Sequence, residues 1–401
     1  MVTVVLDSQA GSCGKGKFIG YLAKKDNADV AINNFMSNAG HTWIDENGEQ
    51  VMTQHLPTSL VNKDTTLMIG PGAAITPRIL FDEMIKYSKA VGDRKIIINP
   101  RAVVITEEHR ELERSIMRSG STFKGCGVAQ ADKVMRQAML FGEFWEKMCD
   151  PDYYFPANSE FENLCNTYGA YKKDGLYVNA RDNEWEYIKN HITVADTMMY
   201  INTAIDYGDE YVLIEGSQGC DLDINYGLAY PNTTSRQCHA GQLVADCGIS
   251  PRLVDDIIMI MRPYPIRISN TTNLADKYGK PLIVSSGDYD GAEEITWDIV
   301  KERCGAPDDV EFGEMTTVTK KMRRVFEMNW ERLVYVTTLN RPTMIALNFA
   351  QYIDWGAYKC KSYDELPEAV KEFIRKIEDF TDVPVKLIGT GPNNDDIIDI
   401  R

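Results

Sequence analysis

The stretch that decides the fold is VTVVLDSQAGSCGKGKFIGYLAKK, residues 2–25. Its first residues, Val2–Leu6, form an apolar and largely β-branched run, which predicts a buried strand. A glycine-rich loop follows, and the apolar residues of Lys15–Lys25 then recur with a helical period. A strand, a glycine loop and a helix in this order place backbone N–H groups at a helix N-terminus, where phosphate binds readily.

The loop itself carries a phosphate-binding pattern. Gly11 to Lys17, GSCGKGK, satisfies the spacing GxxxxGK, and Lys15 and Lys17 add positive charge to the backbone donors. Phe18 stands where such loops normally have Ser or Thr for Mg²⁺. An ordinary glycine turn between strand and helix is the alternative, but the position, the glycines and the lysines together favour a P-loop-like phosphate site after the first strand.

The rest of the chain alternates between short apolar runs and helical patterns. The further strand candidates are Val30–Asn33, Leu67–Ile69, Lys95–Ile98, Tyr211–Ile214, Leu333–Thr337, Met344–Leu347 and Val385–Ile388. The further helix candidates are Pro77–Ala90, Glu107–Arg118, Ala129–Lys147, Pro251–Met261 and Ser362–Phe380. This alternation predicts an α/β fold, with residues 1–401 as a single large domain and a mostly parallel central sheet flanked by helices. Ligands then bind at the carboxyl ends of the strands.

The composition excludes several classes of partner. The net charge is −16, which repels phosphate backbones and anionic lipid, so we expect no binding to nucleic acid or membrane surfaces. The nine cysteines contain no CxxC pair and their number is odd, which indicates reduced thiols in a cytoplasmic compartment. The N-terminus lacks the basic segment and long apolar run of a signal peptide, and no stretch is apolar enough to span a membrane.

Two motifs together resemble the adenylosuccinate synthetase family. GSCGKGK resembles the family's GDEGKGK signature, and Asn38–Thr42, NAGHT, repeats a family stretch at the same distance from the loop. The resemblance implies that Lys15 touches the transferred phosphoryl group and that His41 protonates or polarises the 6-oxygen of a purine. It also implies that Gly40 offers a carbonyl to Mg²⁺ and that Asn38 lies near the nucleotide. A lone histidine is more often structural, but the five-residue match favours catalysis.

Ser12 departs from the family pattern. The family has a catalytic aspartate at this position, which removes the purine N1 proton and helps to hold Mg²⁺. Serine is shorter, so it leaves room for an amino group beside N1, and its hydroxyl can accept a hydrogen bond from that group. The matching loop residues assigned to ATP are Gly14, Lys15, Gly16 and Lys17.

Two further segments resemble the family's monophosphate pocket. The first spans residues 120–136, where Thr122 and Arg136 match ligands of the 5′-phosphate. In the family that arginine comes from the neighbouring subunit, which implies a homodimer. Taken alone, Arg136 would be a solvated helix charge.

The second segment begins at Glu215–Gly219, EGSQG, which resembles EGAQG and places Gln218 at the purine 6-position. Downstream, YPNTT resembles YPYVT, which makes Thr234 a second phosphate ligand. Asp221 and Asp223 lie between these motifs, and we interpret them as acids that stabilise turns rather than as metal ligands.

The sequence TVTKKMRR, residues 317–324, resembles the family's aspartate-binding loop TVTGRPRR. Cations beside hydroxyls suit a dicarboxylate, although a charge run is more often a solvated face. Lysine replaces an arginine of the family at position 321, so a point charge stands in place of a bidentate fork. The residues assigned to aspartate are Thr317, Val318, Thr319, Lys321 and Arg323.

In the family, the motif TKLD recognises the base of the phosphoryl donor and follows a strand late in the sequence. We expect the matching residues of this chain to recognise that base. Here the match is Thr337–Asn340, TTLN, so an amide replaces the carboxylate that accepts from guanine. Asn340 can accept from adenine N6 and donate to a ring nitrogen, which favours ATP or dATP over GTP. The stretch matching STGP would close over that base through Gly389, Gly391 and Pro392.

Four departures from the family form a set, namely Ser12, Lys321, Thr338 and Asn340. This set resembles the bacteriophage branch, the 2-aminoadenylosuccinate synthetases, which accept dGMP. The resemblance implies a Mg²⁺-dependent ligase that phosphorylates the 6-oxygen of dGMP with ATP and then displaces the phosphate with L-aspartate. The products are N6-succino-2-amino-2′-deoxyadenylate, ADP and phosphate, made in the cytoplasm, which is that of the host if a phage encodes the chain.

Two other functions remain open at this stage. One is an ordinary adenylosuccinate synthetase that uses IMP and GTP. The other is a catalytically inactive nucleotide-binding relative, because Ser12 cannot act as a carboxylate base.

Overall fold

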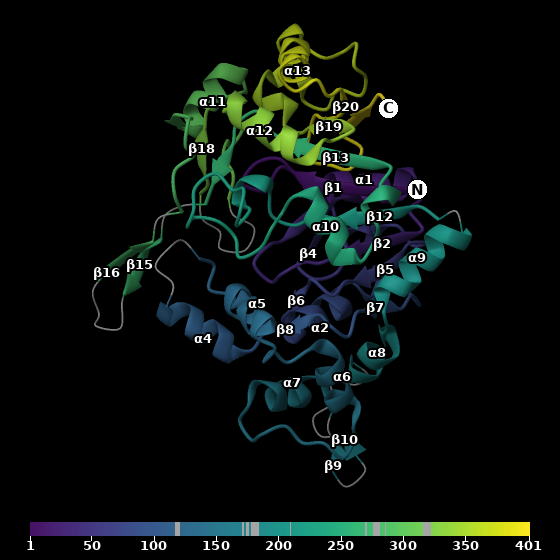
Figure 1. Cartoon of the computed structure of the whole chain (residues 1–401). Coiled ribbons are helices and arrows are strands. Elements are labelled where there is room, and N and C mark those ends of the chain that lie inside the picture. The colour runs from purple at the N-terminus through teal and green to yellow at the C-terminus, as the bar shows by residue number, and fades with distance from the viewer. Residues whose placement is uncertain are drawn as a thin grey trace.

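A ten-stranded central sheet organises the computed structural model (Figure 1). The structure describes residues 1–116, 121–170, 172–173, 176–177, 184–208, 210–268, 271–275, 281–284, 286–315 and 322–401. In sheet order the strands are β11 (Ile192–Val194), β7 (Ile96–Ile98), β5 (Thr66–Ile69), β2 (Val30–Asn33), β12 (Val212–Glu215), β1 (Val2–Asp7), β13 (Asp256–Met261), β19 (Met344–Leu347), β20 (Val385–Gly389) and β21 (Ile397–Asp399). Every pairing is parallel except that of β20 with β21.

Strand β1 lies in the middle of the sheet because its side chains are apolar on both faces. It pairs Val2 with Val212 on one side and Thr3 with Asp256 on the other. Val4 and Val5 point to opposite faces, and both are fully buried. This position brings the loop after β1 to the centre of the carboxyl edge.

Helices cover both faces of the sheet. One face packs against α9 (Thr197–Gly208), α10 (Ala240–Cys247), α12 (Trp330–Asn340) and α13 (Glu368–Thr381). The opposite face packs against α1 (Lys15–Lys25). A second apolar cluster joins the β5–β7 side to α2 (Pro77–Lys86), α6 (Phe141–Cys149), α7 (Glu160–Tyr168) and α8 (Glu184–His191), which form the lower part of the molecule in Figure 1.

The remaining described elements are short. The helices are α3 (Ser88–Val91), α4 (Glu107–Ile116), α5 (Cys126–Met135) and α11 (Trp297–Cys304). Two-stranded sheets pair β3 (His41–Ile44) with β4 (Gln50–Thr53), β6 (Ala74–Ile75) with β8 (Val103–Val104), β9 (Lys172–Lys173) with β10 (Leu176–Tyr177) and β15 (Thr271–Ala275) with β16 (Pro281–Val284). A three-stranded sheet has the order β14 (Ile266–Arg267), β18 (Arg324–Phe326), β17 (Glu294–Ile295). No helix in the described ranges is long and apolar enough to cross a membrane.

The predicted α/β fold with a mostly parallel central sheet is confirmed, but three predicted elements are wrong. Ala129–Lys147, predicted as one helix, contains the end of α5 and most of α6, because the chain leaves α5 at Arg136 in a left-handed conformation. Leu333–Thr337 lies inside helix α12 and is not a strand. Most of Pro251–Met261, predicted as a helix, is strand β13. In α12 the Asn329 side chain accepts from the Arg332 N–H at the N-terminus, and every third or fourth side chain is buried, so capping and packing outweigh the β-branched composition.

Candidate functional site

A cavity of about 870 Å³ opens at the carboxyl edge of the sheet. It is lined by the loop after β1, by the 38–42 stretch after β2 and by Gln218 after β12. The α4–α5 pair, the loop 230–235 and Arg323 also line it. The phosphate loop, the 38–42 stretch and the monophosphate motifs with Thr122, Gln218 and Thr234 therefore converge from distant segments onto one cavity.

The phosphate loop is held in a left-handed conformation that only some residues adopt easily. Gly14, the residue before α1, has φ 101°, and a side chain there would collide with Asn348. Ser12 has φ 56° and is exposed to the cavity. The loop thus presents Ser12 and the start of α1 to a bound anion.

Lys15 forms a salt bridge with Asp7, an acid that the sequence motifs did not single out. Its Nζ donates to the Asp7 carboxylate and to the carbonyl of Gln218, while Lys15 still lines the cavity. Asp7 is completely buried; burial raises the pKa of its carboxyl group, and Lys15 only partly opposes that rise. The available signal was an acid at the end of the first strand, directly before the glycine loop.

His41 lies at the start of β3 and is only 4% exposed. Its ring packs on Phe35, with the two ring centres 4.1 Å apart, and its Nδ1 has no hydrogen bond to any residue that the structure describes. Burial, with a smaller contribution from Lys15, holds the pKa of His41 well below its ordinary value. The imidazole is therefore neutral at neutral pH and can polarise a substrate oxygen through its N–H.

The other nucleotide residues face the same cavity. The Gln218 amide donates to the Asn38 side-chain oxygen over 3.0 Å, which links the segments after β12 and β2. Thr122 lines the cavity, and so does Thr234, whose buried hydroxyl has no partner among the described residues. An unpaired buried hydroxyl is costly, so a ligand oxygen would stabilise it.

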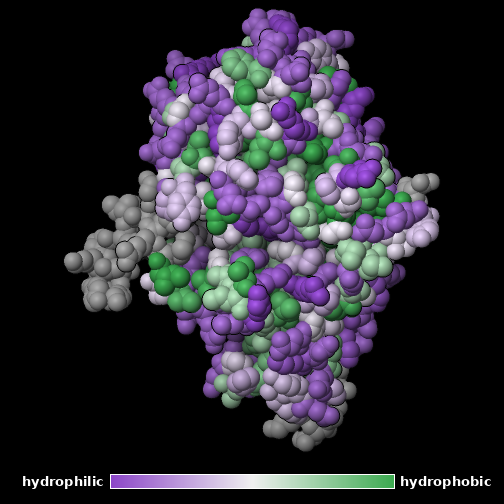
Figure 2. All heavy atoms as spheres, viewed as in Figure 1, coloured by the Kyte–Doolittle hydropathy of each residue, from purple (hydrophilic) through white to green (hydrophobic). Residues whose placement is uncertain are grey.

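Arg136 lies outside the cavity of its own chain. It ends α5 in a left-handed conformation, φ 65°, and its side chain is exposed. Exposed apolar side chains surround this helix end and the neighbouring α4, as Figure 2 shows. They are Leu112, Ile116, Val134 and Met135.

Lys17 does not reach the cavity, which corrects its assignment to ATP. Its Nζ donates to the carbonyls of Gly391 and Asp396, at 2.7 Å each. Burial lowers the pKa of Lys17 to about 7. The lysine therefore fixes the loop that contains Gly389, Gly391 and Pro392, on the far side of β19 from the cavity. Gly16 packs against the backbone of Thr42.

The assignment of Asn340 to the donor base is wrong. Asn340 is the last residue of α12 and is 4% exposed. Its Oδ1 accepts from the Ala240 N–H over 2.8 Å, and its Nδ2 donates to the Val336 carbonyl over 2.7 Å. Both ends of the amide are thus used to join α12 to α10, and neither can read a base.

The strand late in the sequence that ends at this edge of the sheet, beside the phosphate loop, is β19. Residues Asn348 to Gln351 follow it directly. Asn348 donates to the Cys13 carbonyl over 2.9 Å, so this segment touches the phosphate loop. Gln351 lies in the 3-10 turn Ala350–Tyr352, is 7% exposed, and its Oε1 has no partner among the described residues. Gln351 therefore keeps an amide oxygen that is free to accept from a ligand, although this residue is not part of the lining of the 870 Å³ cavity.

Of the five residues assigned to aspartate binding, the structure describes one. Thr317, Val318, Thr319 and Lys321 lie outside the described residues. Arg323 is described and lines the cavity, with 12% of its side chain exposed.

The acids between the nucleotide motifs are structural. The Asp221 carboxylate accepts hydrogen bonds from the side chains of Tyr289 and Arg332. The Asp223 carboxylate accepts hydrogen bonds from backbone N–H groups in a turn, among them those of Asn225 and Cys238. In the part of the chain that the structure describes, no group of three or more His, Cys, Asp or Glu side chains is placed to hold a metal. Ser12 and Gly40 both line the cavity, and the neutral oxygens of these two residues suit Mg²⁺ only together with phosphate oxygens and water.

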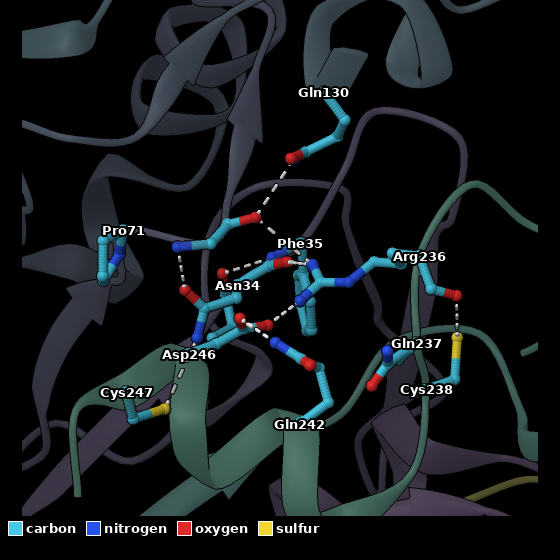
Figure 3. Close-up of polar contacts among 12 residues, drawn as sticks. Asn34, Phe35, Pro71, Gln130, Arg236, Gln237, Cys238, Gln242, Asp246 and Cys247 are labelled. Atoms are coloured by element: carbon cyan, nitrogen blue, oxygen red, sulfur yellow. Dashed lines mark hydrogen bonds and ion pairs between the residues drawn. The ribbon is translucent and has the colours of Figure 1, made fainter. Parts of the chain in front are cut away.

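A second cavity of about 440 Å³ is lined by residues of α5 and α10, and Figure 3 shows polar contacts of several lining residues. Arg236 crosses it and donates to the Asn34 carbonyl and to the Asp246 carboxylate. Lys133 donates to the Pro71 carbonyl. The cations of this second cavity are already paired with groups of neighbouring segments, so they hold these segments together. The first cavity is therefore the candidate active site.

Comparison with known proteins places this geometry in context. A family model described as adenylosuccinate synthetase matches residues 4–355 and 353–398. The N6-succino-2-amino-2′-deoxyadenylate synthase of Salmonella phage PMBT28 is 32% identical over 354 residues, which cover 88% of this chain and 86% of the phage protein. The adenylosuccinate synthetase of Thermococcus onnurineus is 31% identical over 403 residues, covering 99% and 98%.

Two solved structures share the fold. The succinoaminodeoxyadenylate synthetase of cyanophage S-2L, bound to dGMP and dATP as an energy donor, has a TM-score of 0.71 and 25% identity, and the match covers 100% of this chain and 95% of that one. The fully ligated adenylosuccinate synthetase of Plasmodium falciparum has a TM-score of 0.74 and 20% identity, with both chains covered completely.

Proposed function

This chain belongs to the adenylosuccinate synthetase family, whose members are ligases that form a C–N bond, and on that premise we propose that it joins L-aspartate to C6 of dGMP with ATP as phosphoryl donor. The products are N6-succino-2-amino-2′-deoxyadenylate, ADP and phosphate, for the synthesis of 2-aminoadenine DNA precursors. The observation that carries the proposal is Ser12, which lines the same cavity as Lys15 and His41. Serine leaves space beside N1 for the 2-amino group that distinguishes guanine from hypoxanthine.

The residues on the cavity wall suit a two-step reaction. The neutral His41 donates a hydrogen bond to the 6-oxygen as that oxygen attacks the γ-phosphoryl group of ATP, and Lys15 neutralises the transferring charge. ADP leaves as its bond to the γ-phosphorus breaks, and the purine N1 proton passes to water. The amine of aspartate then attacks C6, phosphate leaves with the former 6-oxygen, and one amine proton passes to the departing phosphate. Mg²⁺, when bound through Gly40, Ser12 and the phosphates, supplies further charge neutralisation.

The remaining substrate groups have partners in the same cavity. Thr122 and Thr234 bind the 5′-phosphate, Gln218 and Asn38 bind the purine and its surroundings, and Arg323 binds the aspartate. Arg136 reaches the 5′-phosphate of the neighbouring subunit in a homodimer. The enzyme acts in the cytoplasm, that of the host if a phage encodes it.

Ser12→Asp tests the substrate assignment. We expect wild type to prefer dGMP over IMP, and the variant to shift the ratio of the two kcat/KM values towards IMP. The carboxylate would crowd the 2-amino group, whereas hypoxanthine has no group there. The ratio is the informative quantity, because a substitution can lower both rates for unrelated reasons.

The control is Ser8→Asp, a change of the same kind in the same loop but at a buried serine outside the cavity lining. It should leave the ratio unchanged even if it lowers stability. A wild type that prefers IMP would indicate an ordinary adenylosuccinate synthetase. Nucleotide binding without release of ADP and phosphate would indicate an inactive relative.

Gln351→Asp tests how the donor is read. We propose that the Gln351 amide reads adenine, so that ATP or dATP outperforms GTP, and that a carboxylate at this position accepts from guanine N1–H and its 2-amino group. The ratio of kcat/KM for ATP to that for GTP should fall by about 5-fold or more, because each unmatched buried polar group costs about 1–3 kcal/mol.

Asn340→Asp is the matched control for this experiment. It makes the same chemical change at an amide whose two ends are already paired. We expect it to lower the melting temperature and to leave the ratio of ATP to GTP unchanged. The reverse pattern, with donor choice moved by Asn340→Asp alone, would restore the assignment to α12.

A further inference from the structure

One carboxylate, that of Glu314, bridges two arginines at the edge of the cavity. Arg262 Nη1 donates to its Oε2 over 3.0 Å, and Arg262 Nη2 donates to its Oε1. Arg323 Nη1 donates to the same Oε2, also over 3.0 Å. Neither the sequence motifs nor the proposed reaction gives Glu314 a role.

The inner arginine is rigidly anchored beneath the phosphate loop. The Arg262 side chain is completely buried, and its Nε donates to the Tyr264 carbonyl over 2.8 Å. Its Nη1 also donates to the Ser12 carbonyl over 3.1 Å, and its guanidinium lies 4.4 Å from the centre of the Phe349 ring. Glu314 is therefore fixed relative to the residue that faces the substrate base.

The outer arginine faces the cavity with one edge still available. Glu314 contacts Nη1 of Arg323, while Nε is buried and has no hydrogen-bond partner among the described residues. The side edge of a guanidinium, formed by Nε and the second terminal nitrogen, binds a carboxylate through two parallel hydrogen bonds. Glu314 therefore binds Arg323 through Nη1 alone, and the edge formed by Nε and the second terminal nitrogen remains for a ligand.

The backbone supports the same arrangement. The Arg323 N–H donates to the Glu314 carbonyl over 2.8 Å, and the indole of Trp297 donates to the Arg323 carbonyl over 2.8 Å. Burial alone would raise the pKa of the Glu314 carboxyl, but Arg262 and then Arg323 bring it below its ordinary value. The bridge is therefore an anion between two cations, with a net charge of about +1 for a substrate carboxylate to neutralise.

We propose that Glu314 is a positioning residue for L-aspartate, which orients the free edge of Arg323 towards a substrate carboxylate and ties that edge to Ser12 through Arg262. This inference rests on the proposed function, because it takes the ligand of Arg323 to be aspartate. A positioning role differs from that of a purely structural ion pair in its effect on the substrates. Loss of Glu314 should weaken the binding of aspartate and leave the binding of dGMP and ATP unchanged.

The test is steady-state kinetics of Glu314→Gln with each of the three substrates varied in turn. Glutamine keeps the shape but removes the charge that both guanidiniums share. We expect the KM for aspartate to rise about 10-fold or more, with the KM values for dGMP and ATP within about 2-fold of wild type. Glu314→Asp keeps the charge on a shorter side chain and should recover part of the loss.

The control is Glu311→Gln, an exposed glutamate three residues earlier on the same segment, which should leave all three KM values unchanged. Folding is checked by melting temperature and by stabilisation with dGMP. If Glu314→Gln fails to fold, the Glu314→Asp variant decides, because it should raise the KM for aspartate alone.

The other outcomes overturn the inference. A lower KM for aspartate would mean that Glu314 competes with the substrate instead of preparing its site. A fall in kcat alone, or an equal rise in all three KM values, would mean a structural role. These results differ from a failure of the proposed function, in which wild type itself would form no product that depends on aspartate.

Discussion

Replacing His41 with alanine is expected to lower kcat by about 10²–10⁴-fold, the usual contribution of a positioned proton donor. Binding of dGMP should change little, because the hydrogen bond from His41 matters most as the 6-oxygen attacks, and the proposed contacts of dGMP with Thr122, Thr234 and Gln218 remain. The measurements are kcat from initial rates and the dissociation constant of dGMP from titration calorimetry. Near-normal turnover in the variant would remove His41 from the mechanism.

The control is His191→Ala, which removes a histidine at the end of α8, outside the cavity lining. It should leave kcat within about 2-fold of wild type, as most substitutions away from a site do. The pH dependence gives a second check. Because the pKa of His41 lies well below 6.5, His41 stays neutral as pH falls from about 8 to about 6, so it should add no acid limb to kcat/KM near its ordinary pKa. An acid limb at about pH 6.5 that disappears in His41→Gln would contradict the neutral imidazole.

Arg136→Leu is expected to abolish most activity, and mixing it with His41→Ala protein should restore part of it. If Arg136 serves the neighbouring subunit, a hybrid dimer contains one cavity with both native residues. With free exchange of equal amounts, about one quarter of the wild-type activity should return. The measurement is activity against mixing ratio, with subunit exchange followed by native mass spectrometry.

The matched experiment places both substitutions on one chain and mixes that protein with wild type. In this pairing each cavity of a hybrid lacks one residue if the arginine is shared, whereas one cavity stays intact if it is not. Recovery in the first mixture and none from hybrids in the second defines a shared site. No recovery in the first, despite proven exchange, would place Arg136 outside the active site.

The local motifs could be predicted from the sequence because each is read within a few residues. Gly11–Lys17 follows its strand directly, and the 38–42 stretch keeps its own order, so their convergence required only a parallel sheet. The error at Asn340 had a physical origin. Leu333–Thr337 is rich in residues that favour strands, and only contacts with the sheet and the cap at Asn329 make it helical.

Other residues could not be found because their partners are remote or their environment depends on the whole fold. Glu314 is defined by Arg262, 52 positions away along the chain. The role proposed for Gln351 depends on its place after β19, whose next residue, Asn348, contacts the phosphate loop through the Cys13 carbonyl. Asp7 was visible as an acid before the loop, but its burial and its pairing with Lys15 follow from the central place of β1.

The central place of β1 also has a consequence for biosynthesis. Strand β1 pairs with residues 212–215 and 256–260, so its final neighbours are synthesised long after it, more than half of these 401 residues later. At about 5–20 residues per second, this strand waits for tens of seconds with an apolar run exposed. The phosphate loop is therefore translated well before the strands that organise it, and in the meantime the nascent chain presents an extended apolar segment of the kind that chaperones shield.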